Sequence, residues 1–145
     1  MALALEEARR AGQRGEVPVG AVVVQPSPLR VLASSGNRTE ELCDPSAHAE
    51  ILALRAAAAE LRTPRLVGCD LYVTLEPCAM CATAISFARI RRLYFAAYDV
   101  KGGAVDHGPR IFSRITCHHR PEVYGGMDRG AAETLLKAFF RARRS

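Results

Sequence analysis

Two short strings of this sequence constrain its fold most, because their side chains can form one site only if two helix starts meet. The first string is His48-Ala49-Glu50, and the second is Pro77-Cys78-Ala79-Met80-Cys81. Cysteines three positions apart on a helix face the same way, so both sulfurs can reach one ion. Pro77 is typical of a first helical turn, where the helix dipole favours thiolates. We therefore expect His48, Cys78 and Cys81 to bind one metal ion.

A set of one histidine and two cysteines predicts a catalytic zinc site, with one zinc ion per chain. Three protein ligands leave the fourth position of a tetrahedral zinc ion to water, whereas structural sites are closed. Zinc lowers the pKa of such a water from about 16 to about 7. Glu50 follows His48 by two positions, and we expect it to be the catalytic residue that moves protons. Iron in the same ligand set is the alternative.

A structural zinc site would need a fourth protein ligand. The candidates outside the two strings are Cys43, Cys69, His107, Cys117, His118 and His119. The run from Cys117 to His119 is a candidate second metal patch, although adjacent residues rarely face one ion. Cys43 and Cys69 are interpreted as packed thiols.

Length and composition predict one globular domain over residues 1–145. The chain is 49% hydrophobic and 24% charged, and it lacks an apolar run of about 18 residues, so we expect no membrane helix. Residues 1–14 read as an amphipathic helix without a signal-peptide core. Five cysteines, an odd number, favour a reducing compartment. We therefore expect a cytoplasmic protein.

The charge is concentrated in the C-terminal part of the chain. Residues 89–145 hold twelve basic and five acidic residues, whereas residues 1–88 hold eight and ten. Such a bias is typical of a face that binds a polyanion. Eighteen of the twenty basic residues are arginine, which favours forked contacts with phosphate.

Hydrophobic periodicity predicts alternating helices and strands. We expect helices over 1–14, 47–60, 78–87 and 128–144, strands over 19–24, 30–34, 70–75 and 92–97, and a short edge strand over 122–124. Residues 25–28 are predicted to form a hairpin turn, and residues 99 to about 120 a polar loop. This order indicates a layered α/β domain with a mixed sheet.

The two strings and several others resemble the cytidine deaminase superfamily, and within it the bacterial tRNA-specific adenosine deaminases. The pairing of H-x-E with P-C-x-x-C is a signature of zinc-dependent nucleobase deaminases. The other similar strings lie at 16–22, 36–38, 47–51, 71–78 and 139–144. The resemblance implies a three-layer α/β/α domain with a central mixed five-stranded sheet. It also implies a homodimer that converts adenosine to inosine at the wobble position of a tRNA anticodon stem-loop.

The same resemblance implies roles for residues that zinc chemistry alone does not demand. Asn37 is implied to hydrogen-bond the flipped-out base, and Val17 and Pro18 to wall its pocket. Asp99 and Lys101 are implied to lie in a loop that guides the nucleic-acid strand. The arginines at the C-terminal end, Arg141, Arg143 and Arg144, are implied to lie near the anticodon stem. Glu76, before Pro77, is interpreted as a structural hydrogen-bond acceptor.

Some positions depart from the family pattern and keep other functions open. The usual K-x-G-A-x-G pattern is replaced by a run from Lys101 to Gly108 that places Asp106 and His107 in a loop expected to face RNA. The alternative is a deaminase of small molecules such as guanine, cytosine or cytidine. A zinc-stabilised RNA-binding module without catalysis is a third reading, which Glu50 disfavours because such a module would not need it.

Overall fold

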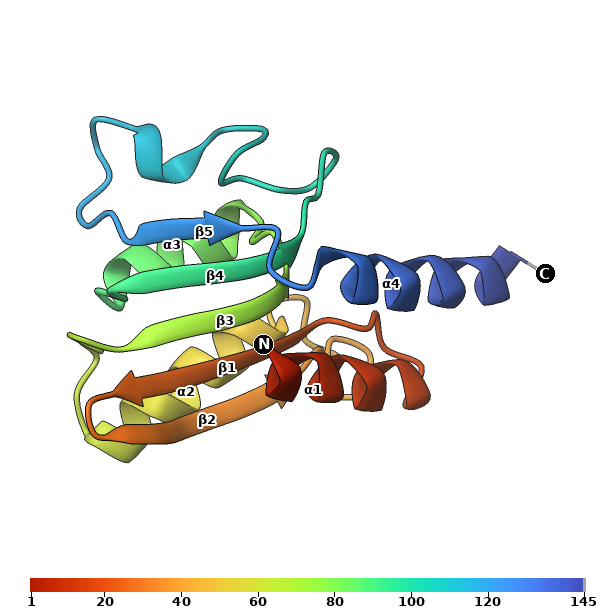
Figure 1. Cartoon of the computed structure of the whole chain (residues 1–145), viewed down its shortest axis with the longest axis horizontal. Coiled ribbons are helices and arrows are strands. Elements are labelled where there is room, and N and C mark those ends of the chain that lie inside the picture. Colours follow the sequence, from red (N-terminus) through yellow and green to blue (C-terminus); the bar gives the residue numbers. More distant parts are fainter. Residues whose placement is uncertain (145) are drawn as a thin grey trace.

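A mixed sheet of five strands, in the order β2-β1-β3-β4-β5, forms the centre of the computed structural model, which describes residues 1–144. In chain order the elements are α1 (Ala2–Gln13), β1 (Gly20–Pro26), β2 (Leu29–Gly36), α2 (Ala49–Leu61), β3 (Asp70–Leu75), α3 (Ala79–Phe87), β4 (Arg92–Ala97), the 3-10 turn η1 (Ile111–Ser113), β5 (Glu122–Gly125) and α4 (Arg129–Arg144). Figure 1 shows this arrangement.

The direction of the strands decides where the sheet can carry a site. Strand β1 pairs antiparallel with both β2 and β3, whereas β3, β4 and β5 run parallel. The β3-α3-β4 segment is a crossover unit, which parallel neighbours require. The carboxyl ends of β3 and β4 therefore lie at the same end of the sheet, where such sheets usually bind ligands.

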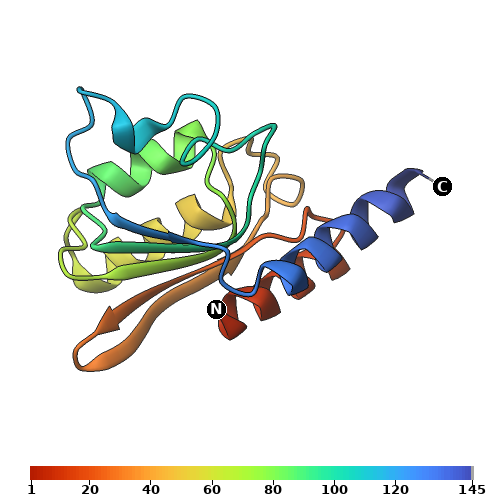
Figure 2. The same ribbon diagram turned by 45° about the horizontal axis from the view of Figure 1, so that its top comes forward.

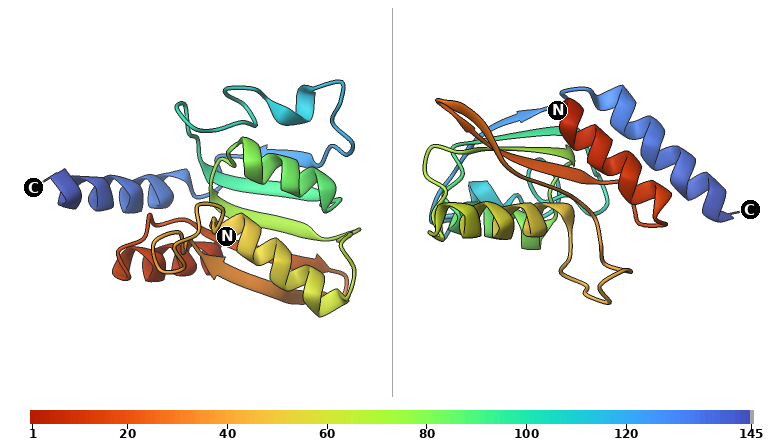
Figure 3. Two further views of the ribbon diagram at one scale, coloured as in Figure 1. Left: turned by 180° about the vertical axis from the view of Figure 1, so that it is seen from behind. Right: turned by 90° about the horizontal axis from the view of Figure 1, so that it is seen from below.

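Helices cover both faces of the sheet, so the predicted three-layer α/β/α fold is confirmed. Helices α2 and α3 lie on one face, and α1 and α4 lie on the other (Figures 2 and 3). The layer between the sheet and the pair α2 and α3 contains most of the core, including the fully buried Leu71, Ile85, Leu93 and Phe95. The apolar residues of β3 and β4 supply this face because side chains alternate along a strand.

The observed bounds differ from the predicted ones by at most two residues. Helices α2 and α3 begin after His48 and Cys78, because these two residues are N-caps with extended backbones. Helix α4 contacts α1 and β4. Phe140 is 44% exposed, although the spacing of the apolar residues at 132, 135, 136, 139 and 140 predicts it on the packed side of this helix. The C-terminal half of α4 extends beyond the sheet, which explains the difference (Figure 1). None of the helices in residues 1–144 has the length and apolar character needed to cross a membrane.

Gly20 allows α1 to lie directly on β1. A Cβ atom at this position would come 1.9 Å from the Ala4 carbonyl oxygen and 2.7 Å from the Ala8 amide nitrogen. Both contacts are with backbone, which cannot move without shifting the helix.

We expect Gly20→Ala to lower the free energy of unfolding by about 3 kcal/mol, since a methyl group would force α1 away from the sheet. Urea unfolding followed by circular dichroism measures this loss. Gly130→Ala is the control, because Gly130 lies in helix α4 and a Cβ atom there would have no neighbour within 4 Å. Its stability should be unchanged or higher by up to about 1 kcal/mol. Equal stability of Gly20→Ala and the wild type would contradict the close packing.

Candidate active site

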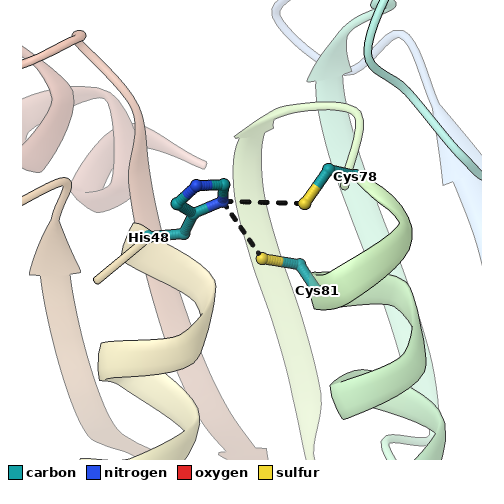
Figure 4. Close-up of side chains that lie close together, drawn as sticks. All are labelled: His48, Cys78 and Cys81. Atoms are coloured by element: carbon teal, nitrogen blue, oxygen red, sulfur yellow. Dashed lines mark hydrogen bonds between the residues drawn. The ribbon is translucent and has the colours of Figure 1, made fainter. Parts of the chain in front are cut away.

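His48, Cys78 and Cys81 come together at the first turns of α2 and α3 (Figure 4). His48 and Cys78 are the N-cap residues of the two helices, and Cys81 lies one turn further along α3. His48 Nδ1 is 3.6 Å from Cys78 Sγ and 3.5 Å from Cys81 Sγ. The three ligand atoms all lie within 4.8 Å of one another. The predicted ligand set is therefore assembled by the fold.

These spacings fit a zinc ion. In a tetrahedral zinc centre, a nitrogen about 2.1 Å and a sulfur about 2.3 Å from the ion lie about 3.6 Å apart. Both observed nitrogen to sulfur distances agree with this value. Within residues 1–144, no fourth histidine, cysteine or carboxylate completes the group. The donor set is thus that of a catalytic zinc site with one position open to solvent.

The electrostatics of the two thiols differ, although both belong to the same group. The hydrogen bond from Cys81, together with His48, lowers the pKa of Cys78 to about 4. The same bond, together with burial, raises the pKa of Cys81. The contact with Cys78 also raises the pKa of His48. Because a zinc ligand must lose its proton, metal binding here releases protons and weakens in acid.

Glu50 lies in the first turn of α2, beside the metal ligands, and is 4% exposed. It lines a cavity of about 350 Å³. The residues around this cavity are Val17, Val19, Asn37, Thr39, His48, Glu50, Leu75, Glu76, Cys78, Asp99 and Gly102. Burial raises the pKa of Glu50 above its usual range. A carboxyl group shifted towards neutrality can both accept and return a proton.

Three of the five residues implied to bind substrate lie at this cavity. Val17, Asn37 and Asp99 line it. Pro18 lies instead in a hollow between α1 and α4. Lys101 is exposed, and its backbone N–H donates to Asp99 Oδ1 at 3.2 Å. The substrate roles of all five residues stay predictions.

The three C-terminal arginines lie on α4, away from the lining of the cavity. Arg143 packs over the ring of Phe139, 4.6 Å from its centre, and donates to the carbonyl oxygen of Gly15. Arg141 and Arg144 line a hollow near the end of the helix. Their contact with RNA also stays a prediction.

Glu76 is the hydrogen-bond acceptor that its position before Pro77 indicated. Its buried carboxylate accepts N–H groups of Asp99, Val105, Asp106 and His107 at 3.0 to 3.2 Å. Although burial opposes the charged form, these bonds and the imidazole of His107, 2.8 Å away, lower the pKa of Glu76. A glycine is required at 103, because a Cβ there would lie 2.5 Å from this carboxylate.

His107, which was expected in a loop facing RNA, therefore turns towards Glu76. It is part of the bond network that holds the loop next to the cavity.

Glu16 has a similar role that the sequence analysis missed. This carboxylate is 1% exposed and accepts the N–H groups of Glu40 and Glu41 at 3.1 and 2.8 Å. The Thr39 hydroxyl also donates to it, at 3.4 Å, and in turn accepts from Asn37 Nδ2. An acidic residue directly before the apolar run at 17–24 was the available signal. Glu16 thus holds the loop that carries Asn37.

The candidate second metal patch at 117–119 is not formed among residues 1–144. His119 Nε2 donates to the carbonyl oxygen of Ile90 at 2.7 Å, and Cys117 Sγ lies 3.5 Å from the Ser86 hydroxyl. Both side chains pack the loop against α3.

Comparison with known proteins agrees with the fold and the site. Residues 1–97 match the family described as the cytidine and deoxycytidylate deaminase zinc-binding region. The tRNA-specific adenosine deaminase of Agrobacterium fabrum is 60% identical, over 99% of this chain and 93% of that protein. A solved structure from a study of adenosine-to-inosine editing by tRNA deaminases at the wobble position has a TM-score of 0.91 and 60% identity, covering 94% of this chain and 97% of that one.

A more distant solved structure is the guanine deaminase of Nitrosomonas europaea. It is 28% identical with a TM-score of 0.81, covering 95% of this chain and 81% of that one. The shared fold thus carries more than one substrate class.

These findings define the class of the protein as a zinc-dependent hydrolase with the cytidine deaminase fold. The chain belongs to the cytidine and deoxycytidylate deaminase family, and within it to the tRNA-specific adenosine deaminases.

We expect Cys78→Ala and Cys81→Ala to lower the zinc content from about one ion per chain to about a tenth of that or less, because two ligands hold the ion weakly. Elemental analysis after gel filtration measures the ratio. Cys43→Ala is the control, since Cys43 is exposed and lies outside the metal group, and it should keep its zinc. A full metal content in either ligand variant would rule out this ligand set.

Proposed function

We propose that this enzyme converts adenosine to inosine at the wobble position of a tRNA anticodon. The observation that carries the proposal is the buried Glu50 in one cavity with two zinc ligands, His48 and Cys78, and with Asn37. The 60% identical relative named as a tRNA-specific adenosine deaminase supports the choice of substrate.

The chemistry requires water to replace the amino group of the base, releasing ammonia. When bound, zinc supplies an activated water molecule at neutral pH. The Glu50 carboxylate accepts a proton from the attacking water and passes it to the ring nitrogen of the base. It then takes up the remaining proton of the added hydroxyl and delivers it to the amine, which leaves as ammonia. The raised pKa of Glu50 suits both directions of transfer.

The remaining cavity residues bind and orient the base. Asn37 is 7% exposed and offers an amide that can pair with the polar edge of a flipped-out base. Val17 and Leu75 supply apolar walls. Because the loop of Asn37 is tied to the buried Glu16, its position is set before substrate arrives.

The anticodon stem-loop is the proposed partner of the surface around this cavity. Lys101 is exposed beside Asp99, which lines the cavity. Arg141, Arg143 and Arg144 give the end of α4 a positive charge suited to phosphates.

A cytoplasmic homodimer completes the proposal. Met80 and Phe87 are 37% and 60% exposed on the outer side of α3, which supports burial of this side against a second copy. All five cysteines are free thiols, which suits a reducing compartment.

A small-molecule deaminase is the second candidate. The structural match to the guanine deaminase of Nitrosomonas europaea favours it, because that protein has the same fold. Cytosine and cytidine belong to the same alternative.

We expect Glu50→Ala to lower kcat by about 1,000-fold or more while zinc stays bound, because the variant lacks the proton carrier. Ammonia release and elemental analysis of the same sample measure both quantities. Glu60→Ala is a matched control, since Glu60 lies at the far end of the same helix and pairs with Arg30 on the surface. Activity of the Glu50 variant within tenfold of the wild type would rule out Glu50 as the residue that transfers protons.

A substrate panel tests the proposed function itself. Ammonia release is compared for a stem-loop with a wobble adenosine, free adenosine, guanine, cytosine and cytidine. We expect turnover of the stem-loop and little turnover of the small molecules. Faster turnover of guanine or cytosine than of the stem-loop would establish the alternative.

A further inference from the structure

A basic hollow, separate from the active-site cavity, lies at the opposite end of the sheet. It has a volume of about 630 Å³. Three segments form its lining, and they lie at the starts of β3, β4 and β5. The lining residues are Arg65, Val67, Gly68, Arg89, Arg91, His119, Arg120 and Glu122. In Figure 1 these segments lie at the starts of the three parallel strands. None of these residues lines the active-site cavity.

The acidic groups near this hollow are already paired. Asp70 accepts two hydrogen bonds from Arg91, at 2.7 and 2.9 Å. Glu122, the acidic residue of the lining, is 2.7 Å from Arg92. Neither carboxylate is therefore left to neutralise the other arginines.

Three guanidinium groups of the lining have no carboxylate partner among residues 1–144. Arg65 is exposed, and its guanidinium has no ion pair and no hydrogen bond in this part of the chain. Arg89 donates only to the carbonyl oxygen of His118, at 3.3 Å. Arg120 donates to two backbone carbonyl oxygens, those of Phe112 and Arg114. Each guanidinium carries five N–H groups, so all three retain free donors.

Uncompensated positive charges around one hollow repel each other and favour an anionic ligand. Arginine forks match phosphate groups, and several arginines together match a phosphodiester chain better than a single small anion. The hollow lacks aromatic side chains on which bases could stack, since His119 is its one ring and its Nε2 bonds the backbone. The chemistry therefore favours backbone contact without recognition of sequence.

The distance to the active site decides which part of an RNA could reach the hollow. A strand of six residues spans about 20 Å, and the two sites lie at opposite ends of β3 and β4. A phosphate in the hollow is thus far from a base in the cavity.

We propose that this hollow binds the phosphodiester backbone of the substrate tRNA at a point outside the anticodon arm. The proposal rests on the proposed function for the identity of the RNA. It assigns to Arg65 and Arg89 a contribution to affinity that a minimal stem-loop does not use.

The test compares the zinc-loaded wild type with Arg65→Gln/Arg89→Gln, leaving Arg120 to hold its loop. Binding of a full-length tRNA with a wobble adenosine and of its isolated anticodon stem-loop is measured across a salt series. On full-length tRNA, we expect about tenfold weaker binding and a salt slope smaller by about 2, roughly one per lost phosphate contact. On the stem-loop, binding should agree with the wild type within about twofold.

Two further variants keep the test decisive. Arg10→Ala/Arg30→Ala removes the same charge at exposed residues that pair with glutamates outside the hollow, and it should bind both RNAs as the wild type does. Arg65→Glu changes one exposed side chain that has no partner in residues 1–144. It should also weaken the binding of full-length tRNA and leave the binding of the stem-loop unchanged. This single variant replaces Arg65→Gln/Arg89→Gln in the test if the double variant does not fold.

Unchanged binding of full-length tRNA by the variants would overturn the proposal. An equal loss on the stem-loop would also overturn it, because the contact would then lie within the anticodon arm. Ammonia release by the wild type is measured in parallel. A wild type that deaminates neither the full-length tRNA nor the stem-loop, with the salt slopes still reduced in the variants, would refute the proposed function and leave the RNA site standing.

Discussion

The convergence of two helix N-termini is the constraint on which the rest of the structure depends. Helices α2 and α3 pack on the same face of the sheet and begin at the same end of it (Figures 3 and 4). Their N-cap residues, His48 and Cys78, are extended, so the side chains face each other across the gap. The helix dipoles add positive potential where thiolates are needed. Cys81 and Glu50 follow within one turn, and the proposed zinc chemistry uses all four.

Two buried carboxylates hold the loops that complete the cavity. Glu76 accepts hydrogen bonds from N–H groups of the loop after β4, and Glu16 accepts them from N–H groups of the loop before α2. Hydrogen bonds to charged groups contribute about 1.5 to 3 kcal/mol each, which offsets the cost of burying the charge. Catalytic sites need such fixed surroundings, because small displacements of a reacting group cost large factors in rate. The loops thus present Asn37 and Asp99 from prepared positions.

Local patterns predicted the layered fold and the metal ligands, because both are encoded at short spacing. The run at 71–75 has the alternation of a strand, and the two cysteines are three positions apart on one helix. Glu16 was missed, because the N–H groups that it accepts lie 24 and 25 positions away. The basic hollow was invisible for the same reason, since three separate segments form it. Pro18 was expected at the pocket wall with Val17, but the two residues line different hollows.

X-ray absorption spectroscopy at the zinc edge of the purified protein tests the central claim most directly. The account predicts two sulfur ligands at about 2.3 Å and two nitrogen or oxygen ligands at about 2.0 to 2.1 Å, one of them from solvent. A shell of three or four sulfurs, or four protein ligands without solvent, would contradict a catalytic site built from His48, Cys78 and Cys81.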